Sequence, residues 1–559
     1  MTGSVSRRNL FKIGGGVAAA GVGASVALTA HAQDPETAVI WHSELVYPGA
    51  DGELNYALDD ASRKKIPNFS FAGYRNGEAP IPTVPAVKTI SSIVGEVDAT
   101  ARINAALAEV AAMPMDANGF CGALKLGPGL YQVAGTIELK YSGVVLRGSG
   151  RSNDPAVGTI IKSTATSGIE NPEDGVECPI RIGSKNQDVD WKARIGDTIP
   201  LAPEVALAGS RRLKLAPNTS LSVGDNIIIW HRCTAEWIAA INGGGVELDQ
   251  PWQPGDQPIM YNRTIKAIDE DEIVICAPIF NDLDPSLSEI FVYKWPNMNE
   301  VVNSGVEDLR VDMVEPPTGL PNNHADSCIV IERSRDTWVR NAATTRFKQS
   351  GVMVRRSHRV TVENVWALEP RSELKGGFRY NFCAGYMAQQ VLFTDVVAAE
   401  ARHAFVAGGG ASASGVVWLD AVSKNGYLES GGHAHWSQGL LFDNVTETMN
   451  SSPEHKKVVL NLHNRADGGA DETGDSHAHG WSSVYSVLWN CKLDNGNRAC
   501  VQRPPTSQNF AIGTTGNVED VVTGSNWLVT EERGYVENEP GTLEPVSLYR
   551  KQLADRLAP

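Results

Sequence analysis

Histidines gather in two short stretches of the sequence that share one pattern. The segments GGHAHWSQG (431–439) and DSHAHGWSS (475–483) each contain His-Ala-His closely followed by tryptophan, and together they hold four of the 12 histidines. Alternate residues of a strand point to the same face, so each pair directs two imidazoles to one side. Imidazole transfers protons near neutral pH and also binds metals. A further histidine, His403, follows Arg402 in EARHAFVAGGG.

Basic and phenolic residues precede these histidines in the segment RSELKGGFRY (371–380). This combination suits β-elimination at a uronic acid, which requires neutralisation of the carboxylate, removal of the C5 proton and protonation of the leaving oxygen. Arginine suits the first task because its planar guanidinium binds a carboxylate through two hydrogen bonds. Histidine, lysine and tyrosine suit the two proton transfers.

These roles can be assigned to named residues. Arg402 or Arg379 would neutralise the carboxylate, His403 or His435 would take the proton, and Tyr380, Lys375 or His479 would protonate the leaving oxygen. The predicted catalytic residues are His403, Arg402, His435, Tyr380, Lys375 and His479, and the predicted substrate-binding residues are Arg379, His433, His477, Trp436, Trp481 and Glu400. The two tryptophans are expected either to stack on sugar rings or to pack.

Three alternatives remain open. A glycoside hydrolase needs two carboxylic acids, for which Glu400 and Glu429 are available. A non-catalytic carbohydrate-binding protein, such as an adhesin, needs neither set of groups. A metal site is the third: the histidine spacing matches no zinc signature and no clear carboxylate cluster is present, so no cofactor is predicted to be required. Ca²⁺ stays open as a cofactor without assigned ligands.

The composition restricts the class of protein. The chain has 559 residues, 42% of them hydrophobic and 20% charged, with 54 glycines and 30 prolines, which is a globular composition rich in turns. A net charge of −16 argues against nucleic-acid binding. The predicted partner is a polysaccharide, most simply an anionic one, and the oligomeric state is not predicted.

A repeat of 23 to 25 residues positions the candidate site. IVIERSRDTWVRNA (329–342) aligns with VMVRRSHRVTVENV (352–365), and the end of this phrase recurs with Asn or Asp at positions 364, 395, 420, 444 and 490. Three short strands and three turns require about this length at roughly 3.3 Å per residue. Side chains one repeat apart would therefore be neighbours at about 4.8 Å per coil. Because 46 residues separate 444 from 490, the two His-Ala-His segments are predicted to lie about two coils apart.

Three further interpretations follow from this repeat. Asp395 and Asp420 occupy the recurring turn position and are interpreted as structural. The basic run Arg355, Arg356, His358 and Arg359 is interpreted as a solvated face of a coil. Residues 187–297 lack the repeat, and segments such as RLKLAPNTSLSVGDNIIIWH predict antiparallel hairpins.

The sequence also resembles a known family. The segment DATARINAALAEVAAM (98–113) predicts a helix, and it precedes GALKLGPGLYQVAGTIELKYSGVVLRGSG (122–150). This order resembles the opening of secreted pectate-lyase-like proteins. RHAFV, HAHWSQGLLFDN and HGWSSVYSVLWNC with RPPTSQN are similar to elements of polygalacturonase-related secreted proteins. The resemblance implies an all-β fold: a right-handed parallel β-helix with an N-terminal capping helix, here with an inserted antiparallel β-domain, and a polysaccharide substrate.

The N-terminus predicts export. SRRNLFK precedes a Gly- and Ala-rich apolar run and an AHA motif at 30–32, the arrangement of a twin-arginine signal. The mature protein is therefore predicted to be periplasmic or extracellular without a membrane span. Of the eight cysteines, Cys491 and Cys500 are candidates for a local disulfide, and most others are predicted to be buried. The predicted divisions are 1–32 (signal), 33–95 (irregular), 96–186 (start of the β-helix), 187–297 (insertion), 298–515 (main coils with the site) and 516–559 (C-terminal tail).

Overall fold

The computed structural model describes residues 39–166, 177–183, 191–217, 220–245, 252–296, 300–449, 458–466, 479–494, 496–520 and 530–558. The predicted signal peptide lies outside these ranges. Ile40–Pro559 forms one compact unit. Within the described residues, no helix combines the length and apolar character needed to cross a bilayer.

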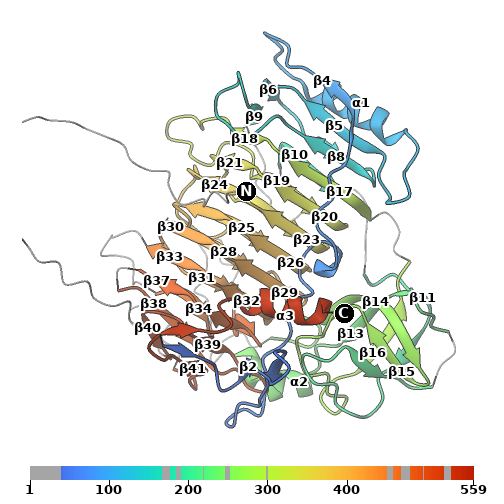
Figure 1. Ribbon diagram of the computed structural model, residues 1–559, viewed down its shortest axis with the longest axis vertical. Coiled ribbons are helices and arrows are strands. Elements are labelled where there is room, and N and C mark those ends of the chain that lie inside the picture. The colour runs from blue at the N-terminus through green and yellow to red at the C-terminus, as the bar shows by residue number, and fades with distance from the viewer. Residues whose placement is uncertain are drawn as a thin grey trace, which may run out of the picture. The chain divides into compact units, whose positions relative to one another are not determined.

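Successive coils pair in parallel at the predicted repeat. Ile329 pairs with Val352, an offset of 23 residues, and Trp338 pairs with Thr361 at the same offset. The strands therefore stack in the same direction over many coils, as the arrows of Figure 1 show. The prediction of a parallel β-helix is confirmed.

The first of three long sheets covers the side of the β-helix that receives the insertion. It has thirteen strands within the described residues. They are β4 (Ala86–Ile90), β5 (Gly122–Leu126), β8 (Val144–Arg147), β17 (Val301–Glu307), β20 (Ser334–Arg340), β23 (His358–Glu363), β26 (Gln389–Thr394), β29 (Ser414–Leu419), β32 (Ser437–Asp443), β35 (Ser483–Val484), β36 (Val487–Trp489), β39 (Phe510–Ile512) and β41 (Tyr535–Glu537).

The second sheet carries Tyr380 and His403, and Arg402 and His433 lie directly next to its strands. Ten of its strands are described. They are β7 (Ile137–Leu139), β10 (Ile180–Gly183), β19 (Ser327–Glu332), β22 (Ser350–Arg355), β25 (Tyr380–Ala384), β28 (His403–Ala407), β31 (Ser430–Gly432), β34 (Val458–Leu462), β38 (Arg498–Val501) and β40 (Asn517–Glu519).

The third sheet closes each coil with short strands, nine of them in the described part of the chain. They are β6 (Gly129–Val133), β9 (Thr159–Ser163), β18 (Arg310–Met313), β21 (Ala343–Thr345), β24 (Trp366–Leu368), β27 (Val397–Ala399), β30 (Val422–Gly426), β33 (Thr446–Met449) and β37 (Lys492–Leu493). Inside the coils, aromatic side chains stack from rung to rung. The Phe393 and Trp418 rings lie 5.7 Å apart, and Trp418 and Phe442 lie 4.7 Å apart.

The recurring Asn or Asp marks one turn of every coil. Each of these residues has a positive φ, a conformation that Asn and Asp tolerate better than most other side chains. The amides also ladder: Asn364 Nδ2 donates to Asn341 Oδ1 at 2.7 Å. The structural role predicted for Asp395 and Asp420 is confirmed, since φ lies between 50° and 57° at Asn341, Asn364, Asp395, Asp420, Asn444 and Asn490.

Helices pack near both ends of the coils. The helix α1 (Thr100–Ala111) packs on β5, β7 and β8 and buries Ile103, Leu107 and Val110. Just before its N-cap, Asp98 accepts from the Thr100 N–H at 2.9 Å. The helix α3 (Leu548–Leu557) is fixed to the coils by Asp443, which accepts from the Ser547 hydroxyl and the Tyr549 N–H, both at 2.8 Å.

Small elements complete the N-terminal segment. The pairs are β1 (Ile40–Trp41) with β42 (Thr542–Leu543) and β2 (Val46–Pro48) with β3 (Leu54–Tyr56), and a 3₁₀ turn, η1, spans Tyr74–Gly77. All eight cysteines are free and buried, so the structure has no Cys491–Cys500 disulfide.

The insertion is antiparallel, as predicted. Its strands are β11 (Ile195–Pro200), β12 (Arg212–Lys214), β13 (Asn226–His231), β14 (Ile259–Asp269), β15 (Glu272–Ile275) and β16 (Ile290–Lys294). The short helices α2 (Ala235–Ala240) and η3 (Asn242–Gly244) lie between β13 and β14 in the chain. Gln389 of β26 ties this sheet to the coils: its amide accepts from the Asn262 N–H at 3.1 Å and donates to the Met260 carbonyl at 2.6 Å.

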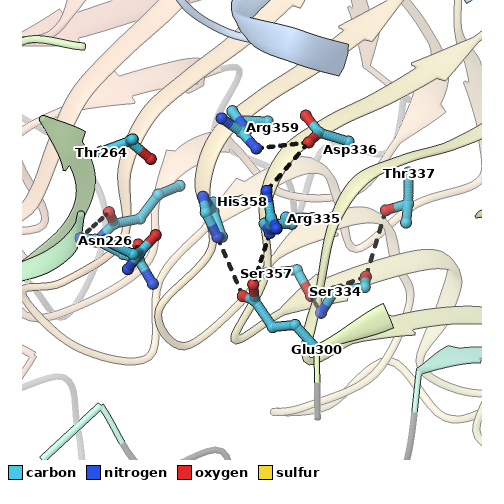
Figure 2. A network of polar contacts seen from close by, with 12 residues as sticks. Asn226, Thr264, Glu300, Ser334, Arg335, Asp336, Thr337, Ser357, His358 and Arg359 are labelled. Atoms are coloured by element: carbon cyan, nitrogen blue, oxygen red, sulfur yellow. Dashed lines mark hydrogen bonds and ion pairs between the residues drawn. The ribbon is translucent and has the colours of Figure 1, made fainter. Parts of the chain in front are cut away.

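A buried ionic network lies where the chain returns from the insertion to the coils. Figure 2 shows His358 and Arg335, neighbours on adjacent strands, both directed at Glu300, at 3.1 Å each. Arg359 pairs with Asp336 at 2.5 Å. Burial, partly offset by Glu300, lowers the pKa of His358. From the sequence, the basic run from Arg355 to Arg359 is interpreted as a solvated face of a coil. This interpretation is wrong for His358 and Arg359, because the insertion and the N-terminal segment pack over this part of the coils.

Candidate functional site

Three aromatic rings meet at the N-terminal ends of β25 and β28 on the second sheet. Tyr380 pairs in register with His403, as residues of neighbouring coils should. The Tyr380 ring centroid lies 5.2 Å from those of His403 and His433, and the two imidazoles lie 5.1 Å apart. Register therefore brings together Tyr380 and His403, and His433, which follows β31, contacts both rings from a different position along the strands.

Three nitrogen atoms surround the Tyr380 hydroxyl. The Gly377 N–H and Arg402 Nη1 donate to this oxygen, each at 3.2 Å, and His433 Nε2 lies at 3.2 Å as well. Arg402 is half-buried and Tyr380 is 8% exposed. The phenol oxygen is thus held between a backbone amide, a guanidinium and an imidazole.

The tautomer of His433 follows from its second partner. Arg465 Nη1 lies 2.8 Å from His433 Nδ1 and 2.6 Å from the His433 carbonyl oxygen. A guanidinium can only donate, so Nδ1 must accept and the ring proton must sit on Nε2. Burial, reinforced by Arg465, keeps the pKa of His433 well below its usual range, so the ring is neutral. His433 Nε2 therefore donates to Tyr380.

His403 is fixed in the opposite tautomer. Its Nδ1 lies 2.5 Å from the Glu429 carbonyl oxygen and therefore carries the proton, while Nε2 is buried without a hydrogen-bond partner among the described residues. Burial and Arg402 lower the pKa of His403 to about 3. The Glu429 carboxylate lies 3.5 Å from Arg465, and although burial acts to raise its pKa, His403 and Arg465 lower it to about 2.

The two His-Ala-His segments meet, contrary to the predicted two-coil separation. The rings of His433 and His479 lie 5.2 Å apart, and those of His435 and His479 lie parallel at 6.4 Å. The His435 N–H donates to the His479 carbonyl at 3.1 Å. The prediction is wrong because β32 pairs directly with β35 and β36, so the 46 residues form one coil with a long excursion.

The insertion lies beside this second pair. The Trp252 ring centroid lies 5.9 Å from that of His435, and the Trp481 N–H donates to the Gly244 carbonyl at 2.8 Å. His435 and His479 are half-buried, and burial and Arg465 lower the pKa of His479 to about 3. Trp252 and Gly244 of the insertion therefore lie at the border of the site.

The two predicted sugar-stacking residues do not face solvent. Trp436 and Trp481 are fully buried at 0% exposure. Trp436 packs edge-on against Trp237 at 5.7 Å and donates its indole N–H to Asn281 at 2.9 Å. Their assignment to substrate binding is wrong because the insertion covers them. His477 lies outside the described residues.

Three further predicted residues lie at the border of this cluster. Lys375 is on the loop before β25, where its ammonium pairs with Glu373 at 2.9 Å. Arg379 directs its guanidinium to Ser372, while its carbonyl accepts from the Arg402 and His403 N–H groups. Glu400 occupies a turn with a φ of 55° just before β28.

Sequence reasoning missed Arg465 and His463. Both follow β34, in the segment VVLNLHNRAD, and both are buried. His463 Nδ1 donates to the Asn464 carbonyl at 2.7 Å, and burial lowers its pKa to about 4. The sequence feature that could have identified them is the alternation of His463 and Arg465 directly after a strand of the second sheet. Among the described residues, no group of three His, Cys, Asp or Glu side chains is arranged to hold a metal ion.

The strand register of the chain itself places it in the class of parallel β-helix proteins. No family model and no curated protein matches the sequence. Solved structures with a similar fold include the tailspike gp49 of Pseudomonas phage LKA1, with 13% identity, a TM-score of 0.41 and coverage of 74% of this chain and 62% of the tailspike. The matched region thus spans less than two thirds of the tailspike.

Two enzymes are also among the similar solved structures. The alginate lyase of Paenibacillus sp. str. FPU-7 is 9% identical with a TM-score of 0.36, over 81% of this chain and 99% of the lyase. The polygalacturonase of Erwinia carotovora ssp. carotovora is 11% identical with a TM-score of 0.36, over 83% of this chain and 98% of that enzyme. These similarities concern the fold.

Proposed function

We propose that this protein is an enzyme that cleaves a uronic-acid-containing polysaccharide by β-elimination. The observation that carries the proposal is the Tyr380 oxygen, which receives hydrogen bonds from Gly377, Arg402 and His433. An oxygen surrounded by three N–H donors is matched to negative charge, as a proton acceptor requires. An exported enzyme would meet such polymers outside the cytoplasm, which agrees with the predicted signal.

Arg402 is the group assigned to the substrate carboxylate. It is half-buried at the border of the cluster, and its guanidinium lies 3.2 Å from the Tyr380 oxygen. A carboxylate bound there would bring the adjacent C5–H to the phenol, and neutralising it would favour loss of that proton. Arg465 is buried and engaged with His433 and Glu429, so it positions these groups and does not bind the carboxylate.

Tyr380 replaces the histidines as the proton-transfer group. His403, His433 and His479 are neutral near pH 7 because the pKa values of His403 and His479 are lowered to about 3 and that of His433 lies well below its usual range. Neutral imidazoles hold no acidic proton for a leaving oxygen, and a pKa of about 3 makes His403 a weak base for the C5 proton. Acting as a phenolate, Tyr380 takes the C5 proton, the C4=C5 double bond forms as the C4–O bond breaks, and the resulting phenol returns the proton to the leaving oxygen. Both transfers then occur on one face of the sugar.

Glycoside hydrolysis is less well supported by the same cluster. A hydrolase needs one carboxylic acid that holds its proton at the working pH. Glu429 pairs with Arg465, and its pKa of about 2 means that it is ionised. Glu400 lies in a turn at the border of the cluster.

A screen of uronic-acid polysaccharides tests the proposal. Polygalacturonate, alginate and glucuronan are incubated with the mature protein, and the ultraviolet absorbance of the unsaturated product is followed. We expect activity with one of them, and a loss of about 10²–10⁴-fold in Tyr380→Phe. Tyr141→Phe, at the edge of the core in the first coils, is the matched control and should retain activity. New reducing ends without absorbance would indicate hydrolysis, and binding without cleavage would leave the adhesin alternative.

A further inference from the structure

Four arginines surround one carboxylate on the second sheet, away from the histidine cluster. Glu332, at the end of β19, pairs with Arg181 at 3.0 Å, Arg333 at 2.8 Å, Arg355 at 3.3 Å and Arg356 at 3.2 Å. Arg355 and Arg356 are the more accessible members, with side chains 15% and 26% exposed. One carboxylate carries one negative charge, so it cannot neutralise both of them.

This arginine cluster shares a row of the second sheet with His433, one residue of the histidine site. Glu332 pairs in register with Arg355, and the same position on the next three coils is held by Gly385, Gly408 and His433. The backbone hydrogen bonds of the ladder continue through these positions. Three steps of about 4.8 Å separate Arg355 from His433 by about 14 Å, a span of a few sugar rings.

The surface next to the arginine cluster carries an aromatic ring. Gly385 is half-buried, and a Cβ added there would have no neighbour closer than 3.6 Å, whereas Gly408 is buried against His433. Tyr386, next to Gly385, is 38% exposed, and the Arg356 guanidinium carbon lies 5.4 Å from its ring centroid. A surface strip with a glycine, an exposed aromatic ring and a cationic end fits an elongated acidic sugar chain.

We propose that Arg355 and Arg356 form a distal subsite for an acidic group of the polysaccharide, with Tyr386 supporting a sugar ring between this subsite and Tyr380. This inference rests on the proposed function, because it takes the polymer bound at the distal subsite to be the polymer that is cleaved. It adds that the substrate carries carboxylates a few residues apart, so that one is held by Arg402 while another reaches Arg355 and Arg356. Burial and the neighbouring arginines lower the pKa of Arg355, in accord with a cationic surrounding that favours an anion.

Binding is measured without relying on catalysis. Hexasaccharides of polygalacturonate, alginate and glucuronan, and their methyl esters, are titrated calorimetrically into Tyr380→Phe and into the same protein carrying Arg355→Gln and Arg356→Gln. We expect the parent to bind one acidic hexasaccharide, the arginine variant to bind it about tenfold more weakly, a loss of about 1.4 kcal/mol, and the ester to be bound equally weakly by both. Equal affinity of both proteins for every acidic hexasaccharide would overturn the inference.

Two further variants separate a subsite from a structural cluster. Arg340→Gln removes one of two arginines that share the buried Glu307 on the first sheet, so it matches Arg356→Gln in kind and should leave binding unchanged. Gly385→Leu leaves the arginines in place but fills the strip, and it should weaken hexasaccharide binding at least as much as the arginine variant. A similar loss in Arg340→Gln, or none in Gly385→Leu, would contradict a distal subsite. Cleavage without such effects would leave the proposed function standing, whereas specific binding without cleavage would leave only the subsite.

Discussion

Arg465 Nη1 lies 2.8 Å from His433 Nδ1, and this contact determines which nitrogen of the imidazole faces Tyr380. Because the guanidinium donates, His433 must present Nε2–H to the phenol oxygen 3.2 Å away. A buried arginine that follows β34 thereby orients the hydrogen bond to a proton-transfer group on β25, three coils earlier. The relationship makes Arg465 a positioning residue.

Arg465→Met should disrupt this arrangement without leaving a cavity, because methionine fills most of the volume of the arginine side chain. Methionine has no N–H groups, so His433 can adopt either tautomer and Glu429 loses its ion pair. We expect kcat/KM on the active polysaccharide to fall about 10²-fold. The ¹⁵N resonances of His433 should change from one fixed tautomer to a mixture, an effect that a purely structural role would not produce.

Arg498→Met is the control for this substitution. Arg498 lies on the next strand of the same sheet, β38, and pairs with Glu519 at 2.9 Å. The Arg498→Met variant should lose as much stability as Arg465→Met or less, while its His433 resonances and its kcat/KM stay unchanged. Retention of full activity by Arg465→Met would show that the tautomer of His433 is not needed.

The repeat made the fold predictable, because 23-residue spacing, alternating apolar residues and turns at Asn or Asp all specify one coil. The expectation that side chains one repeat apart are neighbours also grouped Arg402 and His403 with His433, but it did not predict that Tyr380 pairs in register with His403. It failed where a coil departs from the usual length: the excursion before β35 adds about one repeat, so the spacing of His435 and His479 appeared to span two coils.

Packing of the insertion was the other unpredictable part. The sequence left open whether the tryptophans of the two His-Ala-His segments stack on sugars or pack, and Trp237 and Asn281 of the insertion contact Trp436 and remove it from solvent. His358 and Arg359 were misinterpreted for the same reason. Contacts between a solenoid and a segment outside its repeat have no periodic signature, so sequence patterns cannot reveal them.

Glu447→Gln should change how stability depends on pH. Glu447 is 3% exposed inside the coils, where it accepts from the Ser430 hydroxyl at 2.5 Å, and burial raises its pKa to about 7. A folded-state pKa above the unfolded value means that this group's contribution to stability is fully present below about pH 4.5 and is lost as pH rises through about 7. The free energy of unfolding lost in this way between about pH 4.5 and pH 7 is about 3 kcal/mol.

The variant removes this loss because glutamine does not ionise and can still accept from Ser430. We expect the free energy of unfolding of Glu447→Gln, relative to the natural protein, to increase from pH 4.5 to above pH 7, as measured by urea denaturation. Histidines and other acids titrate in both proteins, so their effects cancel in the difference. The exposed Glu109→Gln should show no such trend, and a flat difference for Glu447→Gln would mean that the buried carboxyl titrates normally.

Gln389→Leu should detach the insertion from the coils. The Gln389 side chain is fully buried and bonds to the Met260 and Ser412 carbonyls, the Asn262 N–H and Arg263. Leucine has a similar volume but leaves these groups without partners, at about 1–3 kcal/mol for each buried group that stays unsatisfied.

The expected result is a loss of several kcal/mol that is concentrated in the insertion. Hydrogen exchange should therefore accelerate in β13 and β14 while β19, β22 and β25 keep their protection. Gln132→Leu, a half-buried glutamine on β6 far from the insertion, serves as the comparison. Because Trp252 and Gly244 of the insertion border His435 and Trp481, polysaccharide cleavage should also weaken in Gln389→Leu. Uniform acceleration of exchange in all coils would show instead that the insertion and the β-helix unfold as one cooperative unit.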